Sequence, residues 1–253
     1  MDKITAYQTV SSLIFTLALA TLAPSRIRAQ SQVSPQEILK AHGAWVKQST
    51  PNASLEAKEV LRQGAAVEYH LFAKGLPSNV SYRLFTWPVT AAKPSMLMDG
   101  ISIGKDGLLI CAGREPDQCG DPTKKDDPVE FAFNPVKGEP FRLEIVSPSA
   151  RAAIVIIPNP IQGKDKGCVL SVVRLTPNFE LAYFSGSGFP PDSEVQVESQ
   201  SYDEKHPITA KVDAGGNVQF AFLPFVADHK KGTTTVKVLG SQCSPALKFE
   251  WGN

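Results

Sequence analysis

Polar and apolar residues alternate along the second half of the chain. Val195, Val197 and Ser199 alternate with charged and amide side chains, and Val236 and Val238 show the same period of two further on. This period is typical of strands with one wet and one dry face, as in antiparallel sheets. It predicts strands at residues 169–174, 181–185, 194–200, 208–213, 218–223, 234–239 and 246–251. So many short strands with turns between them indicate a two-sheet sandwich.

The first half carries a weaker version of the same pattern. It predicts strands at residues 67–73, 81–87, 107–111, 129–133, 141–147 and 152–157. Residues 55–63 have a composition that favours a helix. Their counterpart in the second half is rich in β-branched residues, so we predict a strand in both places.

The two halves repeat one another. Residues 75–82, which begin Gly-Leu-Pro, match residues 188–195, which begin Gly-Phe-Pro. Further along, Asp106-Gly107 corresponds to Gly215-Gly216, and residues 138–145 correspond to residues 232–238. A repeat of about 100 residues has the size of a small domain. We therefore predict five segments: a signal peptide (1–29), an N-terminal helix and linker (30–53), a first sandwich (54–157), a Pro-rich linker (158–167) and a second sandwich (168–253).

A short helix is predicted over residues 34–48. Ser34 can cap it, Pro35 occupies the first helical position, and Glu37 stands where a capping box needs an acid. Apolar residues then recur at helical spacing. We expect this helix to be either an arm packed on the first sandwich or a mobile appendage.

The N-terminus has the features of an export signal. Lys3 precedes an apolar run at residues 10–23, which Pro24 ends. Ala29 offers a small residue for cleavage, and Ala18-Leu19-Ala20 is a second candidate site. The run is too short to cross a hydrocarbon core of about 30 Å. We therefore expect a periplasmic or extracellular protein with no stable membrane insertion after cleavage.

Composition and net charge limit the classes of partner that the chain is expected to bind. Hydrophobic residues make up 42% and charged residues 20% of the chain, which is ordinary for a globular protein. The formal net charge is +1, and removal of the signal would leave the mature chain close to neutral. Such a chain has no electrostatic reason to bind nucleic acid.

The four cysteines are expected to form disulfides because the chain is exported. Three pairings are possible. We favour Cys111 with Cys119 and Cys168 with Cys243, since each pair then stays within one repeat. A zinc site is disfavoured, because the chain has no Cys-x-x-Cys motif and its histidines are scattered.

The run Gly-Ser-Gly-Phe-Pro-Pro-Asp-Ser-Glu-Val at residues 186–195, followed by Gly215-Gly216, resembles a turn in immunoglobulin-like or fibronectin-type modules of secreted bacterial proteins. The resemblance covers the second half directly and the first half through the repeat. It implies immunoglobulin-like sandwiches. With the repeat, the predicted helix and the export signal, we therefore expect an all-β protein of two tandem immunoglobulin-like β-sandwich domains with a short N-terminal helix after a signal peptide. Such modules act as spacers, adhesins or enzyme appendages, so the resemblance implies no activity.

No pattern predicts catalysis. The histidines lie in different predicted elements, and the chain has no nucleophile elbow; they are His42, His70, His206 and His229. Four acids in one polar loop could bind Ca²⁺, but lysines intervene and the EF-hand spacing is missing; the acids are Asp117, Asp121, Asp126 and Asp127. We therefore expect no catalytic residue, no metal and no cofactor.

The sequence thus predicts a non-enzymatic exported binding or structural module, whose partner is an unknown protein or polysaccharide at the cell envelope. We expect its contacts to come from loops at residues 91–101, 112–127, 202–207 and 226–231. The alternative is a carbohydrate-binding or enzyme-accessory module. In that case Trp87, at a strand end, is the candidate ligand contact.

Overall fold

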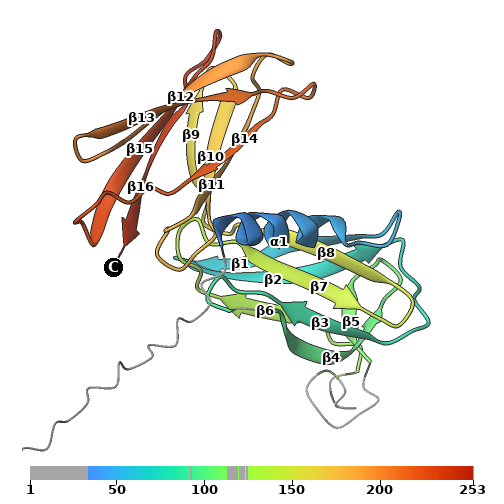
Figure 1. Ribbon diagram of the computed structural model, residues 1–253. Helices are drawn as coiled ribbons and strands as arrows, with labels where there is room; N and C mark the ends of the chain where they lie inside the picture. Colours follow the sequence, from blue (N-terminus) through green and yellow to red (C-terminus); the bar gives the residue numbers. More distant parts are fainter. Residues whose placement is uncertain (1–33, 92, 113–118, 120–122, 124, 253) are drawn as a thin grey trace, which may run out of the picture. The chain divides into compact units, whose positions relative to one another are not determined.

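The computed structural model describes residues 34–91, 93–112, 119, 123 and 125–252. The predicted signal peptide, residues 1–29, lies outside the described residues. Within them the chain forms one helix, α1 (Pro35–Lys47), and strands β1 to β16 (Figure 1). The predicted helix is confirmed with its capping box: the Ser34 hydroxyl accepts from the Glu37 amide, and the Glu37 carboxylate accepts from the Ser34 amide.

The first sandwich consists of two antiparallel sheets. One has the order β1-β2-β6 and the other the order β5-β4-β3-β7-β8. Its strands are β1 (Ser54–Gln63), β2 (Ala66–Lys74), β3 (Tyr82–Thr86), β4 (Ser95–Ile103), β5 (Leu109–Cys111), β6 (Glu130–Phe133), β7 (Phe141–Val146) and β8 (Arg151–Ile156). The side chains that alternate inward from both sheets form one core, which includes Leu71, Tyr82, Leu84, Leu143 and Ile145.

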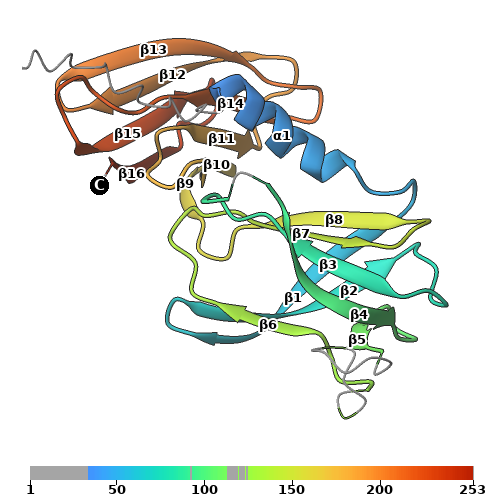
Figure 2. The same ribbon diagram turned by 60° about the horizontal axis from the view of Figure 1, so that its bottom comes forward.

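The second sandwich is built in the same way. Its sheets have the orders β14-β11-β10-β9 and β13-β12-β15-β16, and they form two separate layers (Figure 2). Its strands are β9 (Ile161–Asp165), β10 (Cys168–Arg174), β11 (Ala182–Ser187), β12 (Glu194–Ser201), β13 (Glu204–Lys211), β14 (Val218–Phe222), β15 (Lys231–Leu239) and β16 (Ala246–Gly252). Its core is distinct from the first and includes Leu170, Phe184, Val197, Val236 and Phe249.

The repeat is visible in the strand order. The sheets β1-β2-β6 and β4-β3-β7-β8 correspond to β10-β11-β14 and β13-β12-β15-β16. Gly75 and Gly188 both have positive φ, 69° and 84°, and both lie after the second strand of this common order. The predicted all-β fold of two tandem immunoglobulin-like sandwiches with a short N-terminal helix is therefore confirmed. Residues 55–63 are strand, as the repeat predicted.

Three predictions about connecting segments were wrong. The segment predicted as a linker at 158–167 contains β9, which pairs with β10 across a tight turn at Lys166 and Gly167, both with positive φ. Residues 91–101, predicted as a loop, are largely β4. Residues 202–207, also predicted as a loop, are largely the start of β13, because Pro207 is tolerated on an edge strand.

Both predicted disulfides are confirmed. Cys111 is bonded to Cys119, and Cys168 is bonded to Cys243. Cys168 begins β10 in one sheet of the second sandwich, whereas Cys243 lies between β15 and β16 of the other. The second bridge therefore ties the two sheets together at the margin of their shared core.

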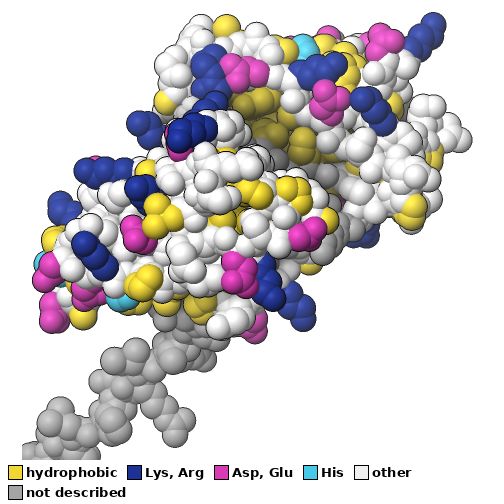
Figure 3. Space-filling model, turned by 90° about the horizontal axis from the view of Figure 1, so that it is seen from above, with side chains coloured by type: hydrophobic (Ala, Val, Ile, Leu, Met, Phe, Trp, Pro, Cys, Tyr) yellow, Lys and Arg dark blue, Asp and Glu magenta, His cyan; other side chains and the backbone are white. Residues whose placement is uncertain are grey.

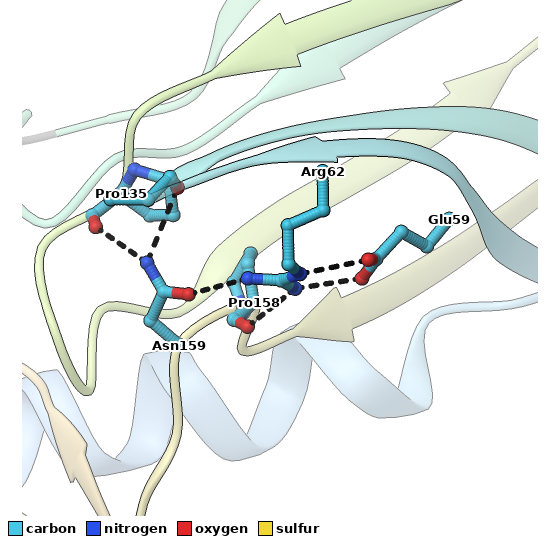
Figure 4. Close-up of polar contacts among 6 residues, drawn as sticks. Glu59, Arg62, Pro135, Pro158 and Asn159 are labelled. Carbon is cyan, nitrogen blue, oxygen red and sulfur yellow. Dashed lines mark hydrogen bonds and ion pairs between the residues drawn. The ribbon is translucent and has the colours of Figure 1, made fainter.

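Arg62 holds the segment that joins the two sandwiches. Its guanidinium donates to the Pro158 carbonyl at 3.0 Å and to Asn159 Oδ1 at 2.8 Å, and it pairs with Glu59 at 2.7 Å (Figure 4). The Asn159 amide in turn donates to the Pro135 carbonyl at 3.1 Å. The start of the segment predicted as a linker is therefore fastened to the first sandwich by polar contacts.

Helix α1 contacts residues of both sandwiches. Its Trp45 ring lies 5.6 Å from the Trp87 ring, and its His42 ring lies 5.5 Å from the Tyr183 ring. Ile38 and Leu39 pack against a small apolar cluster of the second sandwich, formed by Val173, Leu175 and Leu181. Of the two expectations, the packed arm is the one the structure confirms. The arm contacts the second sandwich as well as the first.

Candidate functional site

A side pocket opens between the two sheets of the second sandwich. Strands β13 and β14 are edge strands of opposite sheets, and the cavity of about 250 Å³ lies where they border the core. We call it the side pocket. It is lined by Val197, Ser199, Ser201, Glu204, His206, Ile208, Phe222, Leu223, Pro224, Phe225, Val226 and Thr234.

The alternation of side chains between the two faces of each strand determines which of them reach this pocket. On β12 the odd residues point to the core, so Val197 is followed inward by Ser199 and Ser201. Thr234 faces Ser201 across the β12–β15 ladder, and it is almost fully buried, with 1% of its surface exposed. Apolar residues fill the other inward positions of these strands, so one end of a hydrophobic core carries hydroxyl groups.

Each of these hydroxyls is hydrogen bonded. Ser199 Oγ donates to the His206 carbonyl at 3.3 Å, and Thr234 Oγ1 donates to the Pro224 carbonyl at 3.4 Å. Ser201 Oγ accepts from Trp251 Nε1 at 3.1 Å. Buried polar groups are tolerated when they have partners, so the pocket can keep a polar end inside an apolar interior.

The rim of the side pocket is apolar and exposed. Ile208 is 37% exposed, Leu223 is 46% exposed and Phe225 is 51% exposed. Solvent-exposed apolar side chains are common singly, but a group around a concave site marks a place where something binds. Glu204 and His206 are the ionisable side chains of the lining, and His206 Nε2 lies 3.2 Å from the Glu204 carboxylate.

Two predicted contact segments border this pocket. Residues 202–207 supply Glu204 and His206 from β13, and residues 226–231 supply Val226 from the connection to β15. The segments predicted in the first sandwich, 91–101 and 112–127, contribute nothing to it, and part of the second lies outside the described residues. The sequence pattern predicts that Ser199 lies on the inward face of its strand. A hydroxyl at such a position was the available signal for the side pocket.

Trp87 is surrounded by packing contacts. The ring lies beside Trp45, the Arg142 guanidinium lies 5.0 Å from its centre, and its indole N–H donates to the Ala91 carbonyl at 2.9 Å. These neighbours explain the side chain without a sugar ligand. Its predicted role as a ligand contact stays a prediction.

The four histidines lie on different elements of the described structure. His42 is on α1, His70 on β2, His206 on β13, and His229 stacks on Tyr202. His70 is hydrogen bonded to Glu130 at 2.9 Å, and with Glu68 these side chains form a group whose ligand atoms lie within 4.8 Å of one another. This group faces solvent on strands β2 and β6, and the hydrogen bond accounts for its geometry.

Burial controls the titration of His42. Desolvation, and secondarily the Arg142 guanidinium, lower the pKa of His42 from 6.5 to about 4. Desolvation also lowers the pKa of Arg142 to about 10, against the opposing effect of Glu139. At neutral pH the pair is therefore a neutral imidazole beside a buried cation.

The described residues contain no helix long and apolar enough to span a bilayer. No family model matches the chain, and no curated protein matches it. A solved structure of the FN1–FN3 domains of chicken CNTN1 is similar at 9% identity, with a TM-score of 0.21. The match covers 78% of this chain and 64% of that chain. The fold assignment rests on the strand order and pairing given above.

Proposed function

We propose that this protein is an exported, non-enzymatic binding module, which holds an apolar group of its partner in the side pocket of the second sandwich. The observation that carries the proposal is the coincidence of a cavity, buried hydroxyls and an exposed apolar rim at one edge of the sandwich. Concave, mostly apolar sites with a few convergent polar groups are the usual form of a binding site.

Several features support the other parts of the proposal. Two disulfides are expected to persist in an oxidising compartment, which favours a periplasmic or extracellular location. On the face drawn in Figure 3, basic and acidic side chains are interspersed, so recognition there would depend on shape and apolar contact more than on charge. The cavity lining includes one ionisable pair, Glu204 and His206, and the Ser199 hydroxyl opposite His206 donates to the His206 carbonyl and not to the imidazole.

The test is a titration of the folded protein with the neutral fluorophore N-phenyl-1-naphthylamine. We expect binding of one molecule per chain, weakened at least tenfold by Phe225→Asp, because the charge stands at the apolar mouth. Met96→Asp is the matched control, since Met96 is 54% exposed and belongs to the first sandwich. Absence of binding, or equal affinity in both variants, would show that the side pocket is not a binding site.

A further inference from the structure

The hydroxyls of the side pocket can offer only lone pairs to a ligand. Carbonyl oxygens accept and never donate, so the bonds to His206 and Pro224 fix the hydrogens of Ser199 and Thr234 on those carbonyls. Ser201 is committed twice, because it accepts from Trp251 and donates to the Thr233 carbonyl at 3.4 Å. The polar end of the pocket therefore favours an occupant that carries a hydrogen-bond donor.

The volume of the pocket limits the occupant to a small group. Sites for drug-sized ligands have volumes of about 300–1,000 Å³. The side pocket, at about 250 Å³, falls below that range and suits one large side chain. Its walls are apolar where Val197, Phe222 and Val226 line it, so most of the occupant must be apolar too.

The rim indicates that the occupant belongs to a larger body. Ile208, Leu223 and Phe225 extend the apolar surface beyond the cavity itself. A free molecule that only filled the cavity would leave these side chains in water. A polypeptide on either side of an anchoring side chain would cover them, and that burial favours binding.

The edge strand beside the pocket disfavours one common mode of peptide binding. An extended peptide can add to a sheet edge through main-chain hydrogen bonds. Pro207 lies in the middle of β13 and has no amide hydrogen to donate. The side pocket is therefore the anchoring feature at this edge, and recognition depends on a side chain more than on strand addition.

We infer that the side pocket binds a tryptophan side chain of a partner polypeptide, with the indole N–H donating to Ser199 or Thr234. Tryptophan joins a large apolar body to a single donor, and it is enriched among the anchors of protein interfaces. This inference rests on the proposed function and specifies the ligand of the same site.

The first test compares two acetylated and amidated tripeptides by NMR titration. One is Leu-Trp-Leu, and in the other the tryptophan is replaced by 3-benzothienylalanine, in which sulfur takes the place of the N–H group. We expect the tryptophan peptide to bind roughly fivefold more tightly or better, because only its donor pairs with a buried lone pair. Equal affinities would overturn the inference, and they would leave the proposed function standing if the fluorophore binds as described.

Two variants of the pocket test which hydroxyl gives the preference for the tryptophan peptide. Ser199→Ala and Thr234→Val, made separately, remove one acceptor each, and at least one of them should abolish the preference for tryptophan. Ser171→Ala is the control, because Ser171 lies on β10 outside the pocket lining. A preference that survives both pocket variants would place the peptide elsewhere and overturn the inference. The comparison on the unaltered protein stands even where a variant fails to fold.

A third arm tests whether the ligand is a polypeptide. N-acetyltryptophanamide carries the same indole without neighbours that could reach the rim. We expect it to bind more weakly than the leucine-flanked peptide, with the difference reduced by Phe225→Ser. If the amide binds as tightly as the peptide, a free indole compound is the ligand and the polypeptide assignment is wrong.

Discussion

His42 accepts a hydrogen bond from Arg142, with 3.3 Å between Nδ1 of the imidazole and Nε of the guanidinium. A guanidinium can only donate, so the imidazole must present a lone pair to it. Arg142 is 3% exposed and also donates to the Trp87 carbonyl at 3.2 Å. The contact joins α1 to β7, and it requires His42 to stay neutral.

This contact predicts a loss of stability in mild acid. The pKa of His42 is lowered from 6.5 to about 4 in the folded protein, so between these values the unfolded chain binds the proton more tightly. The stabilisation is complete above pH 6.5 and is lost as the pH falls towards 4. We expect an upper bound of roughly 3 kcal/mol for this loss in the free energy of unfolding, measured by chemical denaturation.

His42→Gln should remove this part of the pH dependence, since glutamine does not titrate. His229→Gln is the control for a histidine substitution outside this contact, because His229 is exposed. Equal slopes of stability against pH for the unaltered protein and His42→Gln would refute the assignment.

Gly75 and Gly188 should be intolerant of alanine. Both have positive φ, and an added Cβ would collide with the backbone carbonyl of Asn52 or of Gly167. We expect each alanine variant to lose roughly 2–4 kcal/mol of unfolding free energy. Gly43→Ala in α1 is the control, since nothing lies within 4 Å of its added Cβ, and it should be neutral or slightly stabilising. Wild-type stability in Gly188→Ala would contradict the equivalence of the two turns.

The two disulfides should differ in their contribution to stability. Cys168 and Cys243 are separated by 75 positions, and Cys111 and Cys119 by 8. The chain-entropy model gives about 4.5 kcal/mol for the longer loop and about 2.5 kcal/mol for the shorter. Paired alanine variants, compared by urea denaturation, should follow this order, and the reverse order would count against loop entropy as the main cause.

Trp87 should matter to folding and not to sugar binding. Its ring lies between Trp45 and Arg142, so Trp87→Ala removes packing under α1 and should cost about 2–4 kcal/mol. Trp87→Phe keeps part of the ring contact and should cost less. The carbohydrate alternative makes the opposite prediction: the protein is retained on a polysaccharide column, and Trp87→Ala abolishes that retention.

The architecture could be predicted from the sequence because the strand pattern of one sandwich occurs twice in the chain. Residues 55–63 favour a helix by composition, yet antiparallel pairing with β2 makes them strand β1, and only the comparison with the second half revealed this. β4 escaped prediction because its pairing with β3 carries register shifts and its outer residues are exposed, so no period of two is visible. β9 is short and contains Gly163, which weakened its pattern further.

The side pocket could not be predicted, because its walls come from strands that are distant in sequence. Ser199 was recognised at an inward position of β12, but only the fold brings it near Thr234 and the connection after β14. A hydroxyl at an inward-facing position of a strand is the local sign of such a site. Its meaning depends on which edges the sandwich leaves open, and that is a tertiary property.

Pro207 also bears on how copies of the protein behave at high concentration. A free strand edge can act as a template for another chain, and growth by that route ends in fibrils. Pro207 leaves β13 without an amide donor at mid-strand, so the row of donors beside the side pocket is interrupted. The second sandwich can therefore keep an open apolar mouth at this edge without seeding aggregation through it.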